Sequence, residues 1–139
     1  MTDRHLFLCP MRWADVDANR HVNNVQYSRY LEEARVHLYR ELTAFAERQG
    51  IAPSGNAYIV TRQEILFLRP LTYHPEPVTI ETRVTKLRGA TVDLSAEILD
   101  GDHLCAKAST TMACVTRGDG RPARLGAAER AFFAQFGSC

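Results

Sequence analysis

The hydrophobic pattern of the chain changes its period near Gly50. Between about residues 24 and 49, apolar side chains recur at steps of three and four, which is the spacing of one helix face. These positions are Tyr27, Tyr30, Leu31, Ala34, Leu38, Leu42, Phe45 and Ala46. Asn23 or Asn24 can cap the start of this helix, and Gly50 suits its end. The sequence therefore predicts one helix of roughly 25 residues, about 37 Å long.

After Gly50 the pattern becomes that of strands. Asp100 and Gly101 form a strong hairpin signal, and an apolar segment over 5–13 predicts one further strand before the helix. Pro10 places that first strand at a sheet edge or a bulge. Residues 127–136 can form a short C-terminal helix. Four segments after the helix have the alternation or the β-branched content of strands: 58–68, 78–84, 92–98 and 104–115.

The predicted order is thus one strand, one long helix and four strands. One helix cannot cover both faces of a five-stranded sheet, but an antiparallel sheet wrapped around the helix would bury the helix. We expect an α+β fold of this kind, forming a single domain over residues 1–139. The open edges of such a sheet would invite a partner subunit.

Composition changes this picture little. The 139 residues include 17 basic and 16 acidic side chains, a net charge of +1, so nucleic acid and anionic membranes are not expected partners. No apolar segment approaches the ~18 residues that span a bilayer. The first five residues lack the apolar segment of a secretory signal, so we expect a cytoplasmic protein. Its cysteines are then expected as reduced thiols, two of them in the core: Cys9, Cys105, Cys114 and Cys139, with Cys105 and Cys114 buried.

Candidate chemistry gathers just before the long helix. Asp17, Asn19 and His21 place a carboxylate, a carboxamide and an imidazole at alternate positions. A helix start offers unpaired N–H groups and the positive end of the helix dipole, which can stabilise an oxyanion during acyl transfer. A carboxylate beside it can attack an acyl carbon or take a proton from water. The same residues also fit an ordinary capping turn, so the pattern alone leaves both interpretations open.

This stretch resembles the signature of hotdog-fold acyl-thioester hydrolases of the 4-hydroxybenzoyl-CoA thioesterase type. Those proteins carry Asp-x-Asp-x-x-Gly-His-Val-Asn-Asn, then Tyr, then Glu-x-Ala-Arg on the helix. It is also similar to plant acyl-carrier-protein thioesterases, which have Asp-x-Asp-x-Asn-x-His-Val-Asn-Asn here. The resemblance implies a hotdog fold and hydrolysis of an acyl thioester. The matching residues are Asp15, Asp17, His21-Val22-Asn23-Asn24, Tyr27 and Glu32-Glu33-Ala34-Arg35.

The resemblance also assigns roles to individual residues. Asp17 stands where the family has its catalytic carboxylate, acting as nucleophile or as general base. The N–H of Asn24 stands where an amide at the helix entrance polarises the thioester carbonyl. Asn19 and His21 match the asparagine and histidine of the plant enzymes. Glu64 resembles their distal glutamate, with a solvated strand residue as the alternative.

Two positions qualify the match. Arg20 replaces the glycine that many bacterial relatives have before the histidine, so it is strained if that glycine supports a positive φ. Asp15 is expected to be structural, in a salt bridge with Arg12 or Arg35.

The resemblance implies an acyl-CoA or acyl-carrier-protein substrate and a homodimer or homotetramer with active sites at the subunit interface. We expect no cofactor and no metal, because the five histidines show no metal-ligand spacing and no glycine-rich phosphate loop is present. A non-catalytic acyl-CoA-binding module is the alternative to an enzyme. Basic side chains could hold the substrate's phosphates, with these candidates: Arg62, Arg69, Lys86, Arg88, Arg117, Arg121 and Arg124.

Overall fold

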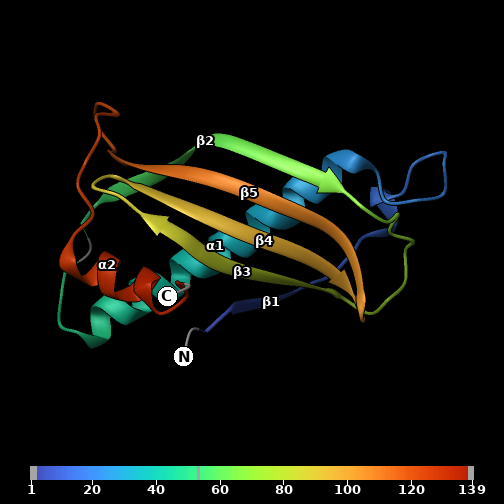
Figure 1. Cartoon of the computed structure of the whole chain (residues 1–139), viewed down its shortest axis with the longest axis horizontal. Coiled ribbons are helices and arrows are strands. Elements are labelled where there is room, and N and C mark those ends of the chain that lie inside the picture. Colours follow the sequence, from blue (N-terminus) through green and yellow to red (C-terminus); the bar gives the residue numbers. More distant parts are fainter. Residues whose placement is uncertain (1–2, 53, 138–139) are drawn as a thin grey trace.

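The computed structural model of the chain describes residues 3–52 and 54–137 (Figure 1). Cys139, one of the expected reduced thiols, lies outside the described residues. The order of elements confirms the prediction of one strand, one long helix, four strands and a short final helix. The elements are β1 (His5–Cys9), the 3-10 helix η1 (Trp13–Asp15), α1 (Asn24–Arg48), β2 (Asn56–Phe67), β3 (Val78–Leu87), β4 (Thr91–Asp100), β5 (His103–Thr116) and α2 (Ala127–Ala134).

The first strand is shorter than predicted. It ends at Cys9 instead of continuing to Trp13. Pro10 follows directly, and its missing N–H cannot join the sheet ladder. The chain then turns through η1, so Trp13 belongs to that turn and not to a strand.

The five strands form one antiparallel sheet in the order β1-β3-β4-β5-β2. The predicted hairpin joins β4 to β5, and Gly101 adopts the left-handed conformation that this turn requires, with φ 59°. β1 and β2 are the two edges. In Figure 1 the sheet curves along α1, which lies across one of its faces. This arrangement confirms the expected α+β architecture.

Helix α1 is amphipathic, and its buried face divides the core into two clusters. Its first half, including Tyr27 and Leu31, packs with residues of β1, β3, β4 and β5. Its second half, including Leu38 and Leu42, packs with Phe132 and other residues of α2 and the sheet. Each fully buried leucine of this kind contributes about 2 kcal/mol of hydrophobic stabilisation. Among the described helices, none combines the length and hydrophobicity needed to cross a membrane.

The three described cysteines are buried in the sheet and unbonded. Burial, with smaller effects of the Glu33 and Asp15 charges, raises the pKa of the Cys9 thiol to about 12. Burial likewise raises the pKa of Cys105 and of Cys114. A nucleophilic cysteine needs a lowered pKa, so these side chains act as core residues, as predicted for Cys105 and Cys114.

Candidate active site

The segment between η1 and α1 is a tight turn anchored to the body of the fold. Val16 and Val22 pair in an antiparallel bridge, and the N–H of Val22 donates to the carbonyl of Leu71 at 2.8 Å. Inside the turn, the N–H of Asp17 donates to the carbonyl of His21 at 3.1 Å. The turn therefore holds the motif residues in a fixed backbone conformation beside the start of the helix.

Arg20 confirms the conformation that the family's glycine suggested. Its φ is 65°, and it is the non-glycine residue of the described chain with a positive φ. Its N–H donates to the carbonyl of Asp17 at 3.0 Å, which closes the turn. A side chain with a β-carbon in this left-handed region costs about 1–2 kcal/mol.

Replacing Arg20 with glycine should therefore stabilise the protein. Relief of the β-carbon clash exceeds the extra chain entropy of glycine, so we expect a gain of about 0.5–1 kcal/mol. Urea denaturation would measure the change in the free energy of unfolding. Arg20→Ala is the matched control, because it removes the guanidinium and keeps the β-carbon. Equal stabilisation by both substitutions would contradict the explanation by strain.

Asp17 presents its carboxylate from this turn, and both of its oxygens are held. Oδ1 accepts a hydrogen bond from the N–H of Asn19 at 2.8 Å. Oδ2 accepts one from Nδ2 of Asn23, also at 2.8 Å. An ionised carboxylate can accept about four hydrogen bonds, so lone pairs remain on each oxygen. The group is thus positioned on both sides and still free to bind a water or to attack a substrate.

Asn23 links this carboxylate to the helix. It is the N-cap of α1, and its Oδ1 accepts from the N–H of Val25 at 2.9 Å. A backbone N–H can only donate, so this contact fixes the orientation of the amide and turns Nδ2 toward Asp17. From the sequence, Asn23 is a candidate cap and a residue of the matching motif. Its second role, as a positioning residue for Asp17, follows from the geometry alone.

Asn24 is the first residue of α1. Its N–H has no carbonyl partner within the helix, because the helix has no residue four positions earlier. No other acceptor among the described residues takes a hydrogen bond from it. This free donor lies one residue from Asn23, at the positive end of the helix dipole. Asn23, which contacts the Asp17 carboxylate, thus directly precedes the residue that carries this unpaired N–H group.

The Asp17 turn lines a surface pocket of about 580 Å³. Trp13, which is 74% exposed, and Tyr73 form an aromatic wall, with their rings edge to face and their centroids 5.8 Å apart. Arg20 adds a positive charge and Asp17 a negative one. The pocket can therefore accept an apolar group against the aromatic rings and an anionic group at the guanidinium. Its full lining is Trp13, Ala14, Val16, Asp17, Ala18, Arg20, Thr72 and Tyr73.

The family model of the thioesterase-like superfamily matches residues 11–133, which include the whole turn, the pocket and every predicted site residue. The chain belongs to the thioesterase-like superfamily. It is a thioester hydrolase, as the resemblance of its motif implied. Among curated proteins, no match was found.

Solved structures similar to this thioesterase have the same fold. A probable thioesterase from Bartonella henselae is 28% identical, with a TM-score of 0.73 over 88% of this chain and 98% of that one. The PA5185 protein of Pseudomonas aeruginosa PAO1 is 24% identical, with a TM-score of 0.81 over 96% and 92%. A thioesterase from Thermus thermophilus, complexed with coenzyme A and Zn, is 23% identical, with a TM-score of 0.75 over 92% and 90%. These similarities confirm the predicted hotdog fold.

The side chains of the other predicted site residues make no hydrogen bond with Asp17 in the described part of the chain. Asn19 and His21 contact Asp17 through their backbones, and their exposed side chains make no hydrogen bond within residues 3–52 and 54–137. Glu64 is exposed on β2 and does not line the pocket. In the described part of the chain it also forms no ion pair with Arg62. The catalytic roles of these side chains stay predictions.

The expected salt bridge of Asp15 is wrong. Asp15 is only 6% exposed, and its Oδ2 accepts from the backbone N–H of Arg12 at 3.0 Å and from the hydroxyl of Tyr30 at 2.6 Å. No ion pair with Arg12 or Arg35 occurs among the described residues. Burial, reinforced by the neighbouring Asp15, raises the pKa of Tyr30 and keeps its hydroxyl a donor. Asp15 is structural as expected, but its carboxylate is hydrogen-bonded by two neutral donors, a backbone N–H and a tyrosine hydroxyl, and not by a charged side chain.

The basic residue that lines the pocket is not one of those expected to bind the phosphates of the substrate. Arg20, which was not among the expected phosphate-binding residues, lines the pocket. Arg88 is paired with Asp93 at 2.9 Å and Arg121 with Asp119 at 3.5 Å. None of the seven basic residues named from the sequence lines this pocket: Arg62, Arg69, Lys86, Arg88, Arg117, Arg121 and Arg124.

A second cavity of about 530 Å³ lies at the other end of α1. Tyr58 lines it, stacks on Tyr39 and donates a hydrogen bond to the carboxylate of Glu129. Burial, together with that carboxylate, raises the pKa of Tyr58. No residue of the thioesterase motif reaches this cavity, so the cavity of the Asp17 turn is the candidate for the chemistry.

Proposed function

We propose that this thioesterase hydrolyses acyl-CoA esters to a free acid and CoA, with Asp17 as its catalytic carboxylate. The observation that carries the proposal is the pairing of two groups across the helix entrance. The carboxylate of Asp17 is held by Asn19 and Asn23, and the free N–H of the helix start belongs to Asn24, the residue next to Asn23. Acyl transfer needs both a nucleophile or base and a donor for the developing oxyanion.

In the proposed reaction the thioester carbonyl oxygen accepts a hydrogen bond from the N–H of Asn24. Asp17 then acts in one of two ways. As a general base it takes a proton from water while the water oxygen bonds to the acyl carbon. As a nucleophile it bonds to that carbon itself, and water later hydrolyses the resulting anhydride. In both routes the C–S bond breaks, the sulfur leaves as the CoA thiolate and water supplies the elements of the acid, so no cofactor is required.

Two observations support CoA as the carrier. Arg20 lines the same pocket as Asp17, and arginine binds phosphate oxygens through paired N–H groups. The similar structure from Thermus thermophilus holds coenzyme A. The aromatic wall of Trp13 and Tyr73 offers apolar surface to the acyl group or to the adenine ring.

Thiol release from a panel of acyl-CoA esters with short, long and aromatic acyl groups tests the proposal. We expect turnover of at least one class, and the ranking of kcat/KM identifies the acyl preference. The same acyl groups on acyl-carrier protein form the comparison. Release from the carrier protein with none from the CoA esters would overturn CoA as the substrate.

We further propose that the protein is a homodimer formed through β2. This edge strand has 12 residues and an unpaired backbone edge. Phe67 at its end packs on Tyr27 near the start of α1, with ring centroids 5.0 Å apart, so a partner on β2 would lie near the candidate active site. The strand exposes four large apolar side chains: Ile59, Val60, Leu66 and Phe67.

Light scattering after size exclusion measures the assembly. We expect a mass of at least twice the 15.7 kDa of one chain. Val60→Lys, at an exposed position, should lower that mass without unfolding the protein, whereas Lys107→Glu on the neighbouring strand is a surface control. A wild-type mass of one chain would contradict the dimer.

A further inference from the structure

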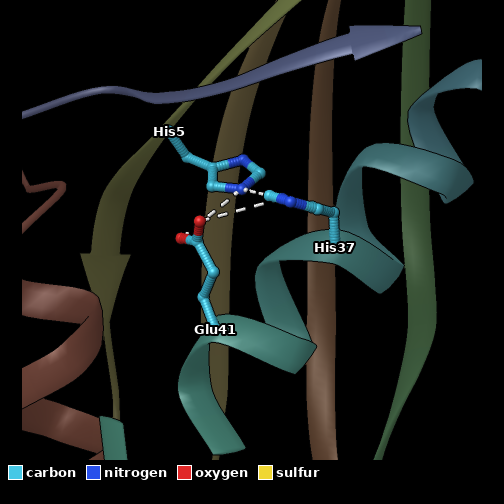
Figure 2. Close-up of side chains that lie close together, drawn as sticks. All are labelled: His5, His37 and Glu41. Atoms are coloured by element: carbon cyan, nitrogen blue, oxygen red, sulfur yellow. Dashed lines mark hydrogen bonds and ion pairs between the residues drawn. The ribbon is translucent and has the colours of Figure 1, made fainter. Parts of the chain in front are cut away.

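A second cluster of polar side chains lies about 20 Å along α1 from the candidate active site. It consists of His5, His37 and Glu41, and Figure 2 shows the three side chains pointing toward one another. Nε2 of His5 lies 2.9 Å from Nδ1 of His37. Oε2 of Glu41 lies 3.7 Å from Nε2 of His5, and Oε1 of Glu41 lies 3.8 Å from Nδ1 of His37. All three groups thus aim a donor atom at one point.

These distances match those between the ligands of one metal ion. A tetrahedral Zn²⁺ with bonds of about 2.1 Å holds its ligand atoms about 3.4 Å apart. The two imidazole nitrogens lie 2.9 Å apart, and each lies 3.7 or 3.8 Å from a different oxygen of Glu41, so the observed separations fall on both sides of that value. An ion between the three groups would need only small side-chain adjustments, and its fourth position would be open to water.

The fold fixes the positions of all three side chains. His37 and Glu41 are four residues apart, so they lie on the same face of α1. His5 begins β1, the edge strand that runs beside the helix, and is 3% exposed. Aromatic neighbours hold the two rings: Phe136 packs edge to face on His5, and Phe7 packs on His37. The ligands are thus preorganised, which limits the entropy lost when an ion binds.

The cluster is closed on one side and open on the other. The side chains of His37 and Glu41 are 41% and 45% exposed, so an ion can enter from solvent. Every polar contact that His5 makes in the described part of the chain runs through Nε2, the atom facing the cluster. Burial lowers the pKa of His5, Glu41 partly opposes this effect, and His37 adds to it.

We propose that His5, His37 and Glu41 bind a divalent transition-metal ion, with Zn²⁺ as the preferred ion. Two imidazoles and one carboxylate suit Zn²⁺, whereas Mg²⁺ and Ca²⁺ prefer sites built from oxygen alone. The ion joins His5 on β1 to His37 in the middle of α1, two residues that lie 32 positions apart in the sequence. Its effect is to stabilise the edge of the sheet, and the proposed hydrolysis at Asp17 does not use it.

Thermal unfolding of the untagged full-length protein tests the proposal. After removal of metals with a chelator, addition of ZnCl₂ should raise the Tm by roughly 5–10 °C at a free Zn²⁺ concentration about 100-fold above the Kd. Titration with Co²⁺ should give the visible absorption bands of a tetrahedral site and saturate at one ion per chain. Both readouts need no substrate, so failure of the proposed hydrolysis would leave this test intact.

Substitutions of the two half-exposed ligands assign the site. His37→Gln and Glu41→Gln should each abolish most of the Zn²⁺-dependent rise in Tm and the Co²⁺ bands. His103→Gln and Glu47→Gln are matched controls, because both residues are exposed and lie outside the cluster, and they should retain the full response. The proposal would be overturned by a wild-type protein without a response, or by a response that survives in both ligand variants.

Discussion

Asp17→Asn is expected to lower kcat for thioester hydrolysis by about 1,000-fold, with KM nearly unchanged. The substitution keeps the size of the side chain and removes the charge that, in the proposed mechanism, attacks the acyl carbon or takes a proton from water. Thiol release from the best substrate of the acyl-CoA panel measures this effect. Turnover within a few-fold of the wild-type value would exclude Asp17 as the catalytic group.

The same substitution should also cost about 1 kcal/mol of folding stability. Both oxygens of Asp17 accept hydrogen bonds, from Asn19 and from Asn23, and an asparagine offers only one oxygen. Asn23 cannot turn its amide to compensate, because its own oxygen caps the helix at Val25. In the variant, the side-chain NH2 at position 17 therefore faces the NH2 of Asn23, and two donors meet without an acceptor between them.

This conflict provides a matched control for the loss of activity. In the double variant Asp17→Asn/Asn23→Asp, the new amide can donate to the new carboxylate, which can still cap Val25. Stability should return toward that of the wild type, while turnover stays low. Recovery of turnover together with stability would show that the single variant fails through misfolding and not through loss of the catalytic group.

Asp15→Ala is expected to produce the largest loss of stability, about 3 kcal/mol, which lowers Tm by roughly 10 °C. Asp15 is buried, and its removal leaves the hydroxyl of Tyr30 and the N–H of Arg12 without their acceptor. Buried donors without a partner carry their full desolvation cost. Urea or thermal denaturation measures the effect, and Asp102→Ala at an exposed position should change stability by less than about 0.5 kcal/mol.

A double-mutant cycle separates the hydrogen bond from the general effect of cavity formation. Tyr30→Phe removes the donor and should cost about 1–2 kcal/mol. The combination of Asp15→Ala with Tyr30→Phe should cost less than the sum of the two single changes, because the second change removes the orphaned hydroxyl. Strict additivity would contradict a direct energetic link between the two side chains.

Much of the fold could be predicted because its elements have clear periods. The steps of three and four in α1 and the alternation in β4 correspond to buried faces in the structure. The hairpin at Asp100 and Gly101 needed only a residue that tolerates a positive φ. The first strand was predicted too long because apolar residues continue past Pro10, where the missing N–H ends the pairing.

The finer contacts of the candidate site could not be predicted, because they depend on backbone groups. The sequence offered Arg12 and Arg35 as charged partners for Asp15, but its donors are a backbone N–H and a tyrosine hydroxyl. Arg20 lines the pocket from a left-handed turn that no pattern of charges reveals.

The histidine cluster illustrates a second limit of sequence interpretation. Metal-ligand spacing within one segment is visible in a sequence, but His37 and Glu41, four residues apart on α1, have the spacing of any helical pair. Their third partner, His5, lies on a different element and meets them only because β1 pairs with β3 beside α1. Ligand sets assembled across a fold therefore need the topology as well as the sequence.

The N-cap at Asn23 makes the first turn of α1 part of the proposed catalytic arrangement. Helix ends open far more readily than whole domains unfold, at a small fraction of the global free energy. Each such opening breaks the hydrogen bond that the N–H of Val25 donates to Asn23 and frees the amide that holds Asp17. The active fraction of the enzyme is then governed by local fraying, so hydrolysis should decline on warming several degrees before the core of the sheet melts.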